Sequence, residues 1–214
     1  MTTTLSVDTS TVVAAAIAVD GRIIASASVD DTRAHAEELM PLVQRVVAEA
    51  GTTLADVDRV VAGVGPGPFT GLRVGVVTAL TLAEVLGVPV VGACSLDAVA
   101  AAWASTGAPG DFLVVSDARR KEVYWARYDG TGRRVAGPEV SAPDALPALP
   151  LAGPGAHLVG EASGPIDLDA GWLAAADLPD AGLEPLYLRR PDAEVPTKAK
   201  SALPAPRPGL RRTR

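Results

Sequence analysis

Residues 59–87 constrain the fold most, because a buried strand, a glycine-rich turn and a long apolar helix follow one another there without a break. The strand is predicted over residues 59–64, and apolar residues recur at helical spacing from residue 72 until Gly87, which favours the left-handed end of a helix. The turn between them reads Gly-Pro-Gly-Pro-Phe-Thr-Gly. Such a turn either presents backbone N–H groups to an anion or brings two backbones close together. It lacks the Gly-Lys-Ser/Thr ending of a Walker A loop, so by itself it is only a weak sign of nucleotide binding.

The rest of the first half alternates strands and helices around this unit. Asp20-Gly21 joins two β-rich runs and predicts a hairpin. Apolar positions at helical spacing predict a first helix that stops at Gly51, and Ser95 is the expected cap of a later helix. The predicted elements are β-rich runs at residues 5–10, 12–19 and 22–29, a helix over 39–50, a short capped helix at 53–56, the strand and helix of 59–87, a strand at 89–91 and a helix over 95–103.

A change of composition at residues 105–110 indicates a boundary between two lobes. A second apolar strand follows it and ends in Asp117, and a hairpin with the turn Asp-Gly-Thr-Gly comes next, so the second half restarts as the first began. We expect a loop over residues 141–155, a short strand at 157–160 and a small helix near 173–176. The predicted domains are an N-terminal lobe over residues 1–104, a smaller C-terminal lobe over 111–190 and a tail over 191–214.

Composition excludes several classes of protein. Of the 214 residues, 48% are hydrophobic and 21% are charged, which is enough to bury one good core or two small ones. The longest apolar runs fall short of the roughly 20 residues that a membrane span needs, and residues 1–4 do not resemble a signal peptide. We therefore expect a soluble cytoplasmic protein with no membrane association. The single cysteine, Cys94, excludes an internal disulfide and a cysteine-based zinc cluster.

Charge is unevenly spread along the chain. The net charge is −6, yet residues 196–214 contribute +6 without a single acid, which leaves −12 on residues 1–195. A body so acidic repels a phosphate backbone. The basic, proline-rich tail over residues 191–214 is predicted to be disordered and offers positive charge to RNA, although a solvated extension is the simpler interpretation.

Several motifs taken together resemble one protein family. Residues 7–10 (Val-Asp-Thr-Ser) lie upstream of the glycine turn, residues 117–126 (Asp-Ala-Arg-Arg-Lys-Glu-Val-Tyr-Trp-Ala) lie downstream, and residues 185–189 (Pro-Leu-Tyr-Leu-Arg) come near the end. With the turn itself they closely resemble the bacterial TsaB family, also called YeaZ, a glycoprotease-like paralogue of TsaD. The resemblance covers residues 1–190. It departs from the family pattern at Pro68, where a serine is usual, and at the basic pair Arg120-Lys121.

The resemblance implies an actin-like ATPase or ribonuclease H-like α/β fold, in which two lobes each carry a mixed sheet flanked by helices and the second lobe is reduced. It also implies a role in making threonylcarbamoyladenosine beside the anticodon of tRNA. In that role the chain is the non-catalytic, cofactor-free partner of the transferase TsaD, with the ATPase TsaE as a further partner. The tRNA then meets the complex rather than this chain alone, and the isolated chain is a monomer or a homodimer.

The residues themselves also argue against catalysis. TsaD-like enzymes hold a metal through His-x-x-x-His on the first helix, whereas here His35 is followed four residues later by Leu39, so we expect no metal. The turn after residue 117 carries bulky side chains in place of glycines, and these occupy space that a triphosphate needs. We expect Asp8 to cap its own turn. The predicted vestigial anion site comprises Asp8, Thr9, Asp117 and Arg119.

Two helices are predicted to bind a partner. The second helix is apolar nearly all round, and a helix that is apolar on more than one face needs more than one cover. The predicted partner interface comprises Leu39, Leu42, Val43, Val46, Val47, Val76, Ala79, Leu80 and Ala83. The predicted glycine loop comprises Gly65, Gly67, Phe69, Thr70, Gly71 and Arg73.

Two other functions stay open on sequence grounds. An active ATPase or kinase of the same fold would explain Asp8 and the glycine turn, but not the apolar helices. A metalloprotease fits least well, because the sequence offers no set of metal ligands at a suitable spacing.

Overall fold

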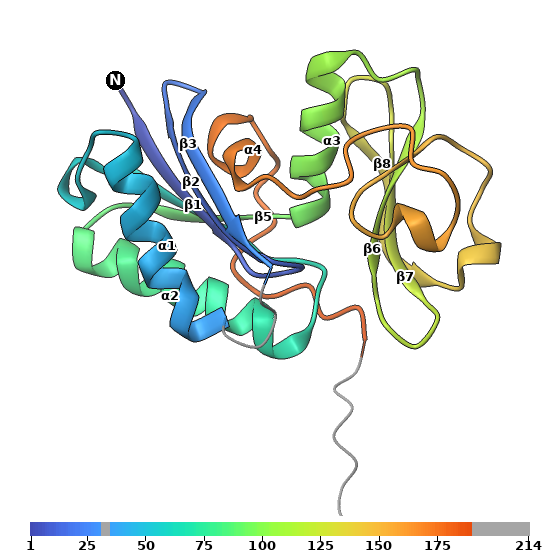
Figure 1. The fold of residues 1–214 in the computed structure, drawn as a ribbon, viewed down its shortest axis with the longest axis horizontal. Helices are drawn as coiled ribbons and strands as arrows, with labels where there is room; N and C mark the ends of the chain where they lie inside the picture. The colour runs from blue at the N-terminus through green and yellow to red at the C-terminus, as the bar shows by residue number, and fades with distance from the viewer. Residues whose placement is uncertain (31–34, 190–214) are drawn as a thin grey trace, which may run out of the picture.

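The computed structural model describes residues 1–30 and 35–189, and the predicted tail over residues 191–214 lies outside them. Within the described residues the chain forms two β-sheets with helices beside and between them (Figure 1). The first sheet has the strand order β3-β2-β1-β4-β5. Its strands are β1 (Thr3–Asp8), β2 (Val13–Val19), β3 (Arg22–Val29), β4 (Arg59–Gly63) and β5 (Val90–Ala93).

The first sheet is mixed. Strands β1, β2 and β3 pair in antiparallel fashion, and the predicted hairpin at Asp20-Gly21 is confirmed, with positive φ angles of 47° and 74° at these two residues. Strand β4 pairs with β1 in parallel, and β5 pairs with β4 in parallel. Parallel neighbours need a crossover, which here is helical. The crossover helices are α1 (His35–Glu49) and α2 (Phe69–Leu86).

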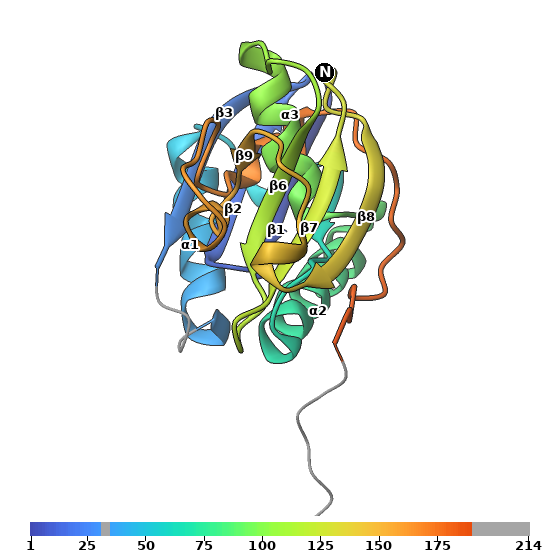
Figure 2. The same cartoon turned by 90° about the vertical axis from the view of Figure 1, so that its right-hand side faces the viewer.

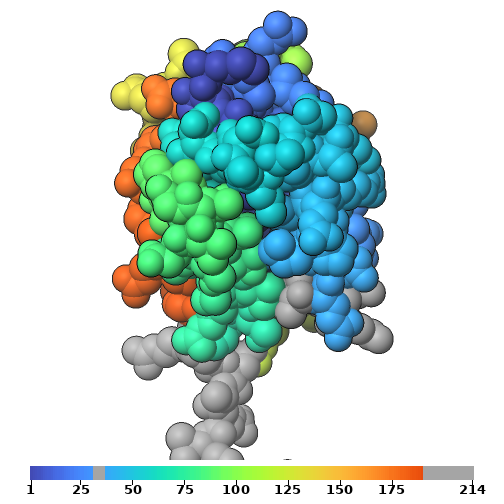
Figure 3. Space-filling model, turned by 90° about the vertical axis from the view of Figure 1, so that its left-hand side faces the viewer, coloured from blue at the N-terminus to red at the C-terminus, as the bar shows by residue number. Residues whose placement is uncertain are grey.

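Helices α1 and α2 lie side by side on one face of the first sheet (Figures 1 and 3). Side chains alternate along β1, so that Leu5 and Val7 point to these helices and are fully buried in their core. The first helix ends as predicted at Gly51, with φ +67°, and α2 ends at Gly87, with φ +68°. By length and composition α2 could also cross a membrane, but here its Leu72, Ala79 and other buried residues pack into the fold.

The opposite face of the first sheet is covered by α4 (Ala170–Ala175), and α3 (Ser95–Thr106) packs beside it, with Leu96 and Val99 in one core with Ala14 and Ala16. The hydroxyl of Ser6 on this face donates a hydrogen bond to the carbonyl of Ala170, at 2.6 Å. Helix α3 also packs against the second sheet, so it lies between the two sheets (Figure 1). The predicted cap of α3 is wrong: Cys94 precedes the helix as its cap residue, and the hydroxyl of Ser95 binds elsewhere.

The second sheet has the strand order β8-β7-β6-β9 (Figure 2). The loop predicted over residues 141–155 contains the short strand β9, which pairs with β6 in parallel. The strand predicted at residues 157–160 is wrong, because residues 156–158 form one turn of 3-10 helix. The strands are β6 (Phe112–Asp117), β7 (Val123–Tyr128), β8 (Arg134–Ser141) and β9 (Leu151–Ala152), and the 3-10 turns of the chain are Leu54–Asp56, Pro143–Ala145 and Ala156–Leu158.

After the second sheet the chain returns to the first. Helix α4 packs on β1, β2 and β3, the amide of Ala181 donates to the carbonyl of Gly92 at 2.8 Å, and the amide of Leu186 donates to the carbonyl of Val64 at 2.8 Å. The boundary predicted near residues 105–110 falls between α3 and β6. The first sheet is therefore completed by residues that follow the second sheet in sequence.

Candidate functional site

The glycine loop begins at Gly65, and this residue is linked to the end of β1 through Ser95. The amide of Gly65 donates to the Ser95 hydroxyl at 3.0 Å, and the amide of Ser95 donates to the Gly65 carbonyl at 2.8 Å. The same hydroxyl donates to the carboxylate of Asp8. Ser95, the first residue of α3, therefore connects Gly65 in the loop before α2 with Asp8, the last residue of β1.

Glycines around the loop allow parts of the chain to approach closely. A Cβ atom at Gly63 would lie 1.7 Å from the Asp8 carboxylate, and one at Gly67 would lie 2.5 Å from the carbonyl oxygen of Ser10. Real Cβ atoms essentially never come this close to another heavy atom. Of the two interpretations of the turn left open by the sequence, close approach of two backbones is the one seen at Gly67, whereas Gly63 makes room for the Asp8 side chain.

Thr9, which follows β1, ties that strand to the first turns of α2. Its hydroxyl donates to the carbonyl of Gly71 at 2.7 Å and accepts from the amide of Gly75 at 3.0 Å. A Cβ atom at Gly75 would lie 2.4 Å from this hydroxyl oxygen. Thr9 is fully buried, so its only polar side-chain atom is used within the fold.

Asp8 caps its own turn, as predicted. One of its carboxylate oxygens accepts hydrogen bonds from the amide of Ser10 at 2.7 Å and from the Ser10 hydroxyl at 2.6 Å. Asp8 is fully buried, and this burial raises the pKa of its carboxyl, although the hydrogen bonds from Ser10 and Ser95 act in the opposite direction. The assignment of Asp8 and Thr9 to a former anion site stays a prediction.

The raised pKa of Asp8 predicts a pH dependence of stability. Below the ordinary pKa of 3.8 the carboxyl is neutral in both the folded and the unfolded chain. As the pH rises, the unfolded chain ionises first, so the contribution of Asp8 to stability falls until the folded group has also ionised. Asp8→Asn, which cannot ionise, is expected to cost about 1 kcal/mol at pH 4 and less at pH 7. Urea unfolding of both proteins across this range measures the gap, and a gap that is constant or widens with pH would contradict the prediction.

The turn between β6 and β7 carries the other two predicted anion-site residues. The guanidinium of Arg119 pairs with the Asp117 carboxylate at 3.0 Å. Three consecutive residues of this turn have positive φ angles, which residues other than glycine rarely adopt. They are Arg119, Arg120 and Lys121, with φ angles of 63°, 54° and 63°. Asp117 and Arg119 are partly or fully exposed here, whereas Asp8 and Thr9 are buried at the end of β1, and the hydrogen bonds and ion pairs found for the described residues do not join the two pairs.

The terminal motif, residues 185–189, connects the glycine loop with this turn. The Tyr187 ring packs against Phe69 at 4.8 Å between centroids, and its hydroxyl oxygen accepts from Nε of Arg73 at 3.0 Å. The Arg73 guanidinium also lies 3.9 Å above the centre of the Phe69 ring. Arg189 donates to the carbonyl of Ala118 at 2.9 Å and pairs with Glu122. The motifs were recognisable one by one in the sequence, but no local pattern indicates that they touch.

Most of the predicted partner interface lies inside this chain, which corrects the prediction. Eight of the nine residues are at most 9% exposed because they form the side of α1 and α2 that packs on the first sheet, and only Leu80, at 40%, reaches solvent. The exposed apolar surface of α2 consists of Val77, Leu80 and Val85, at 59%, 40% and 77% exposure. We call these three residues the α2 apolar face. The buried residues are Leu39, Leu42, Val43, Val46, Val47, Val76, Ala79 and Ala83.

Metal and nucleophile chemistry has few candidates in the described part of the chain. Leu39, at the second position of the expected histidine pair, is buried in the core, and the side chain of His35 lies outside the described residues. Across residues 1–30 and 35–189, no three histidine, cysteine, aspartate or glutamate side chains come together as a metal site would require. Burial raises the pKa of the Cys94 thiol to about 12, so it stays protonated at neutral pH.

The chain is similar to known proteins in sequence. The family model described as TsaD, tRNA N6-adenosine threonylcarbamoyltransferase, matches residues 24–169. An uncharacterized protein of Mycobacterium tuberculosis is 50% identical over 175 residues, which cover 77% of this chain and 79% of that protein. The tRNA threonylcarbamoyladenosine biosynthesis protein TsaB of Escherichia coli is 40% identical over 97 residues, or 45% of this chain and 42% of that protein.

A solved structure shares the fold. YeaZ from Pseudomonas aeruginosa superposes with a TM-score of 0.66 at 29% identity, covering 81% of this chain and 89% of that chain. The predicted α/β fold with two mixed sheets flanked by helices is confirmed. The family model, the sequence relatives and the solved structure all agree with the family that the sequence motifs resemble. The chain therefore belongs to the TsaB (YeaZ) family.

Proposed function

We propose that this chain is a non-catalytic partner of a TsaD-type transferase in the biosynthesis of threonylcarbamoyladenosine in tRNA, and that the α2 apolar face is its docking surface. The observation that carries the proposal is the exposure of Val77, Leu80 and Val85 on one long helix. Large apolar side chains exposed on one helix favour a protein interaction site. TsaE is a further partner of the same complex, and the tRNA meets the complex rather than this chain alone.

The extent of the family match supports a TsaD-type chain as the partner. The model described as TsaD covers residues 24–169, which include both α1 and α2. A TsaD-type chain therefore carries counterparts of these two helices. Two such helix pairs can pack as a four-helix bundle, with apolar faces in its centre. The same geometry allows a second copy of this chain to dock when the transferase is missing.

The packing around Asp8 supports a non-catalytic role over the alternative of an active ATPase or kinase. The carboxylate is fully buried and is already engaged by Ser10 and Ser95. In an active ATPase or kinase, a carboxylate that orients a metal-bound phosphate must be accessible to that ligand, and Asp8 is not. The bulky, left-handed turn at Arg119 to Lys121 also differs from the glycine turns that cradle phosphates.

The proposal is tested with the purified chain and its cognate TsaD-type protein. We expect a stable heterodimer by size-exclusion chromatography with light scattering, and we expect threonylcarbamoyladenosine formation in a reconstituted assay to require both chains. The chain alone is expected to show neither ATP hydrolysis nor stoichiometric metal. Turnover of ATP by the isolated chain would favour the ATPase or kinase, and a failure of the two proteins to associate would refute the partner role.

A further inference from the structure

The face of the first sheet opposite α2 contains a cavity of about 350 Å³. The short helix α4 covers strands β1 to β3, and the segment that follows it, residues 176–180, lines the cavity beside β4 and β5, where Leu178 packs with Val61 and Ala93. Val61, Ala93 and Leu173 line it with apolar surface. Its volume is at the lower end of the range for small-molecule sites, so a ligand here is small.

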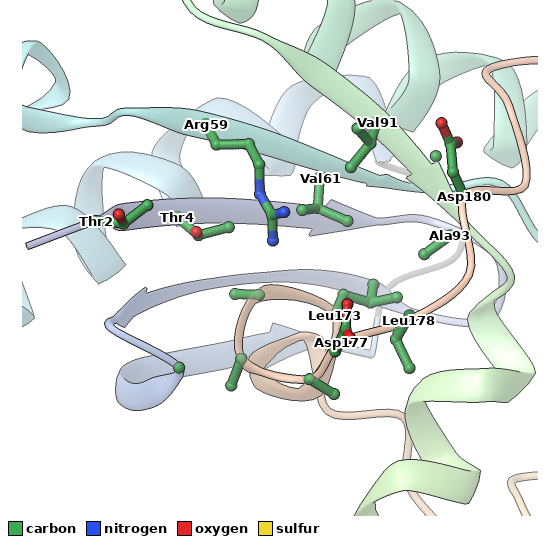
Figure 4. Close-up of a pocket in the computed structure, with 15 residues that line it drawn as sticks. Thr2, Thr4, Arg59, Val61, Val91, Ala93, Leu173, Asp177, Leu178 and Asp180 are labelled. Atoms are coloured by element: carbon green, nitrogen blue, oxygen red, sulfur yellow. The ribbon is translucent and has the colours of Figure 1, made fainter. Parts of the chain in front are cut away.

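Arg59 supplies positive charge to this cavity. It is the first residue of β4, and its side chain extends across the sheet toward the wall formed by Leu173 and Asp177 (Figure 4). Its Nε is buried and has no hydrogen-bond partner among the described residues. A buried donor left unpaired costs about 1–3 kcal/mol, and more in a charged group. The planar guanidinium fork matches a carboxylate, which can satisfy two of its donors at once.

Negative groups line the same cavity. Asp177 and Asp180 belong to the segment that closes it (Figure 4). Residues 173–175, the last turn of α4, also line it, and the carbonyls of a last helical turn lack donors within their helix. These acceptors suit an ammonium group. Two carboxylates on the walls of the same cavity also disfavour a doubly charged phosphate.

We propose that this cavity binds a small zwitterionic amino acid. Arg59 holds its carboxylate, Asp177 and the last turn of α4 face its ammonium group, and an aliphatic side chain lies over Val61 and Ala93. The site is on the other side of the sheet from the α2 apolar face. It is therefore independent of the proposed partner role, and each can fail without the other.

Binding is tested by titration calorimetry of the full chain with each of the common L-amino acids. We expect at least one with an aliphatic side chain to bind saturably, with one site per chain. Its N-acetyl derivative lacks the ammonium group and its methyl ester lacks the carboxylate, so each is expected to bind about tenfold more weakly or worse. The proposal is wrong when every amino acid fails to saturate by about 10 mM, or when inorganic phosphate or the N-acetyl derivative binds equally well.

Variants then place the ligand. Arg59→Gln and Asp177→Asn are expected to lower affinity about tenfold or more, and Arg59→Lys is expected to lower it less, because it keeps the charge but loses the fork. Arg45→Gln is the matched control, since Arg45 lies exposed on α1, away from the cavity, and pairs with Glu49. Melting temperatures identify any variant that fails to fold; should Arg59→Gln be one, Arg59→Lys and Asp177→Asn decide. Unchanged affinity in the folded variants would overturn the assignment.

Discussion

Replacing Val77 by glutamate is expected to abolish association with the TsaD-type partner while leaving the isolated chain folded. Val77 is 59% exposed, so a carboxylate there stays hydrated in the free chain. In a docked helix bundle the same charge would be desolvated without a partner. The expected cost is about 2–4 kcal/mol, a loss of affinity on the order of 30- to 1,000-fold. Calorimetry or light scattering of the mixture measures it.

The matched control is Val135→Glu. Val135 is also an exposed valine, at 46%, but it lies on β8 of the second sheet. This variant is expected to bind the partner like the unmodified chain. Normal binding by Val77→Glu, or equal loss of binding in both variants, would show that the docking surface does not lie on α2.

Replacing Gly67 by alanine is expected to destabilise the fold by about 2–3 kcal/mol, and so to lower the melting temperature by about 4–12 °C. The added Cβ would lie 2.5 Å from the Ser10 carbonyl oxygen and 2.8 Å from its Cα. Both atoms are backbone, so relief requires a shift of the whole turn after β1. That turn also carries the hydrogen bonds of Ser10 to Asp8.

Gly160→Ala is the control for this prediction. A Cβ there meets only the end of the Leu151 side chain, at 3.4 Å, which is an ordinary contact. Its melting temperature is expected to stay within about 2 °C of the original. Equal melting temperatures for the two variants would mean that the close approach of the glycine loop to β1 contributes little to stability.

Local features of the fold were predictable because their causes are local. Asp20-Gly21 makes a hairpin through positive φ angles, and Gly87 ends α2 in the left-handed conformation. The strand β9 was missed because it is only two residues long, and its pairing with β6 depends on distant residues. Ser95 stands where a cap residue is common, but its hydroxyl serves Gly65 and Asp8 instead.

The candidate site shows a similar limit. Helical periodicity identifies a face that is buried, but it does not say what buries it. The nearly uniform apolar character of α2 was the useful signal, since Val77, Leu80 and Val85 are apolar residues of this helix that the core does not cover. The contact of Arg73 with Tyr187 joins residues 114 positions apart, and no local pattern contains it.

The return of α4 to the first sheet has a consequence for synthesis on the ribosome. Strands β1 to β5 emerge early, but the helix that covers Ser6 and its neighbours begins at residue 170. Until that residue has left the ribosome, part of one sheet face has no cover, while the second sheet can already form. The first lobe thus starts to fold first and finishes last, which extends the time in which its sheet is open to aggregation.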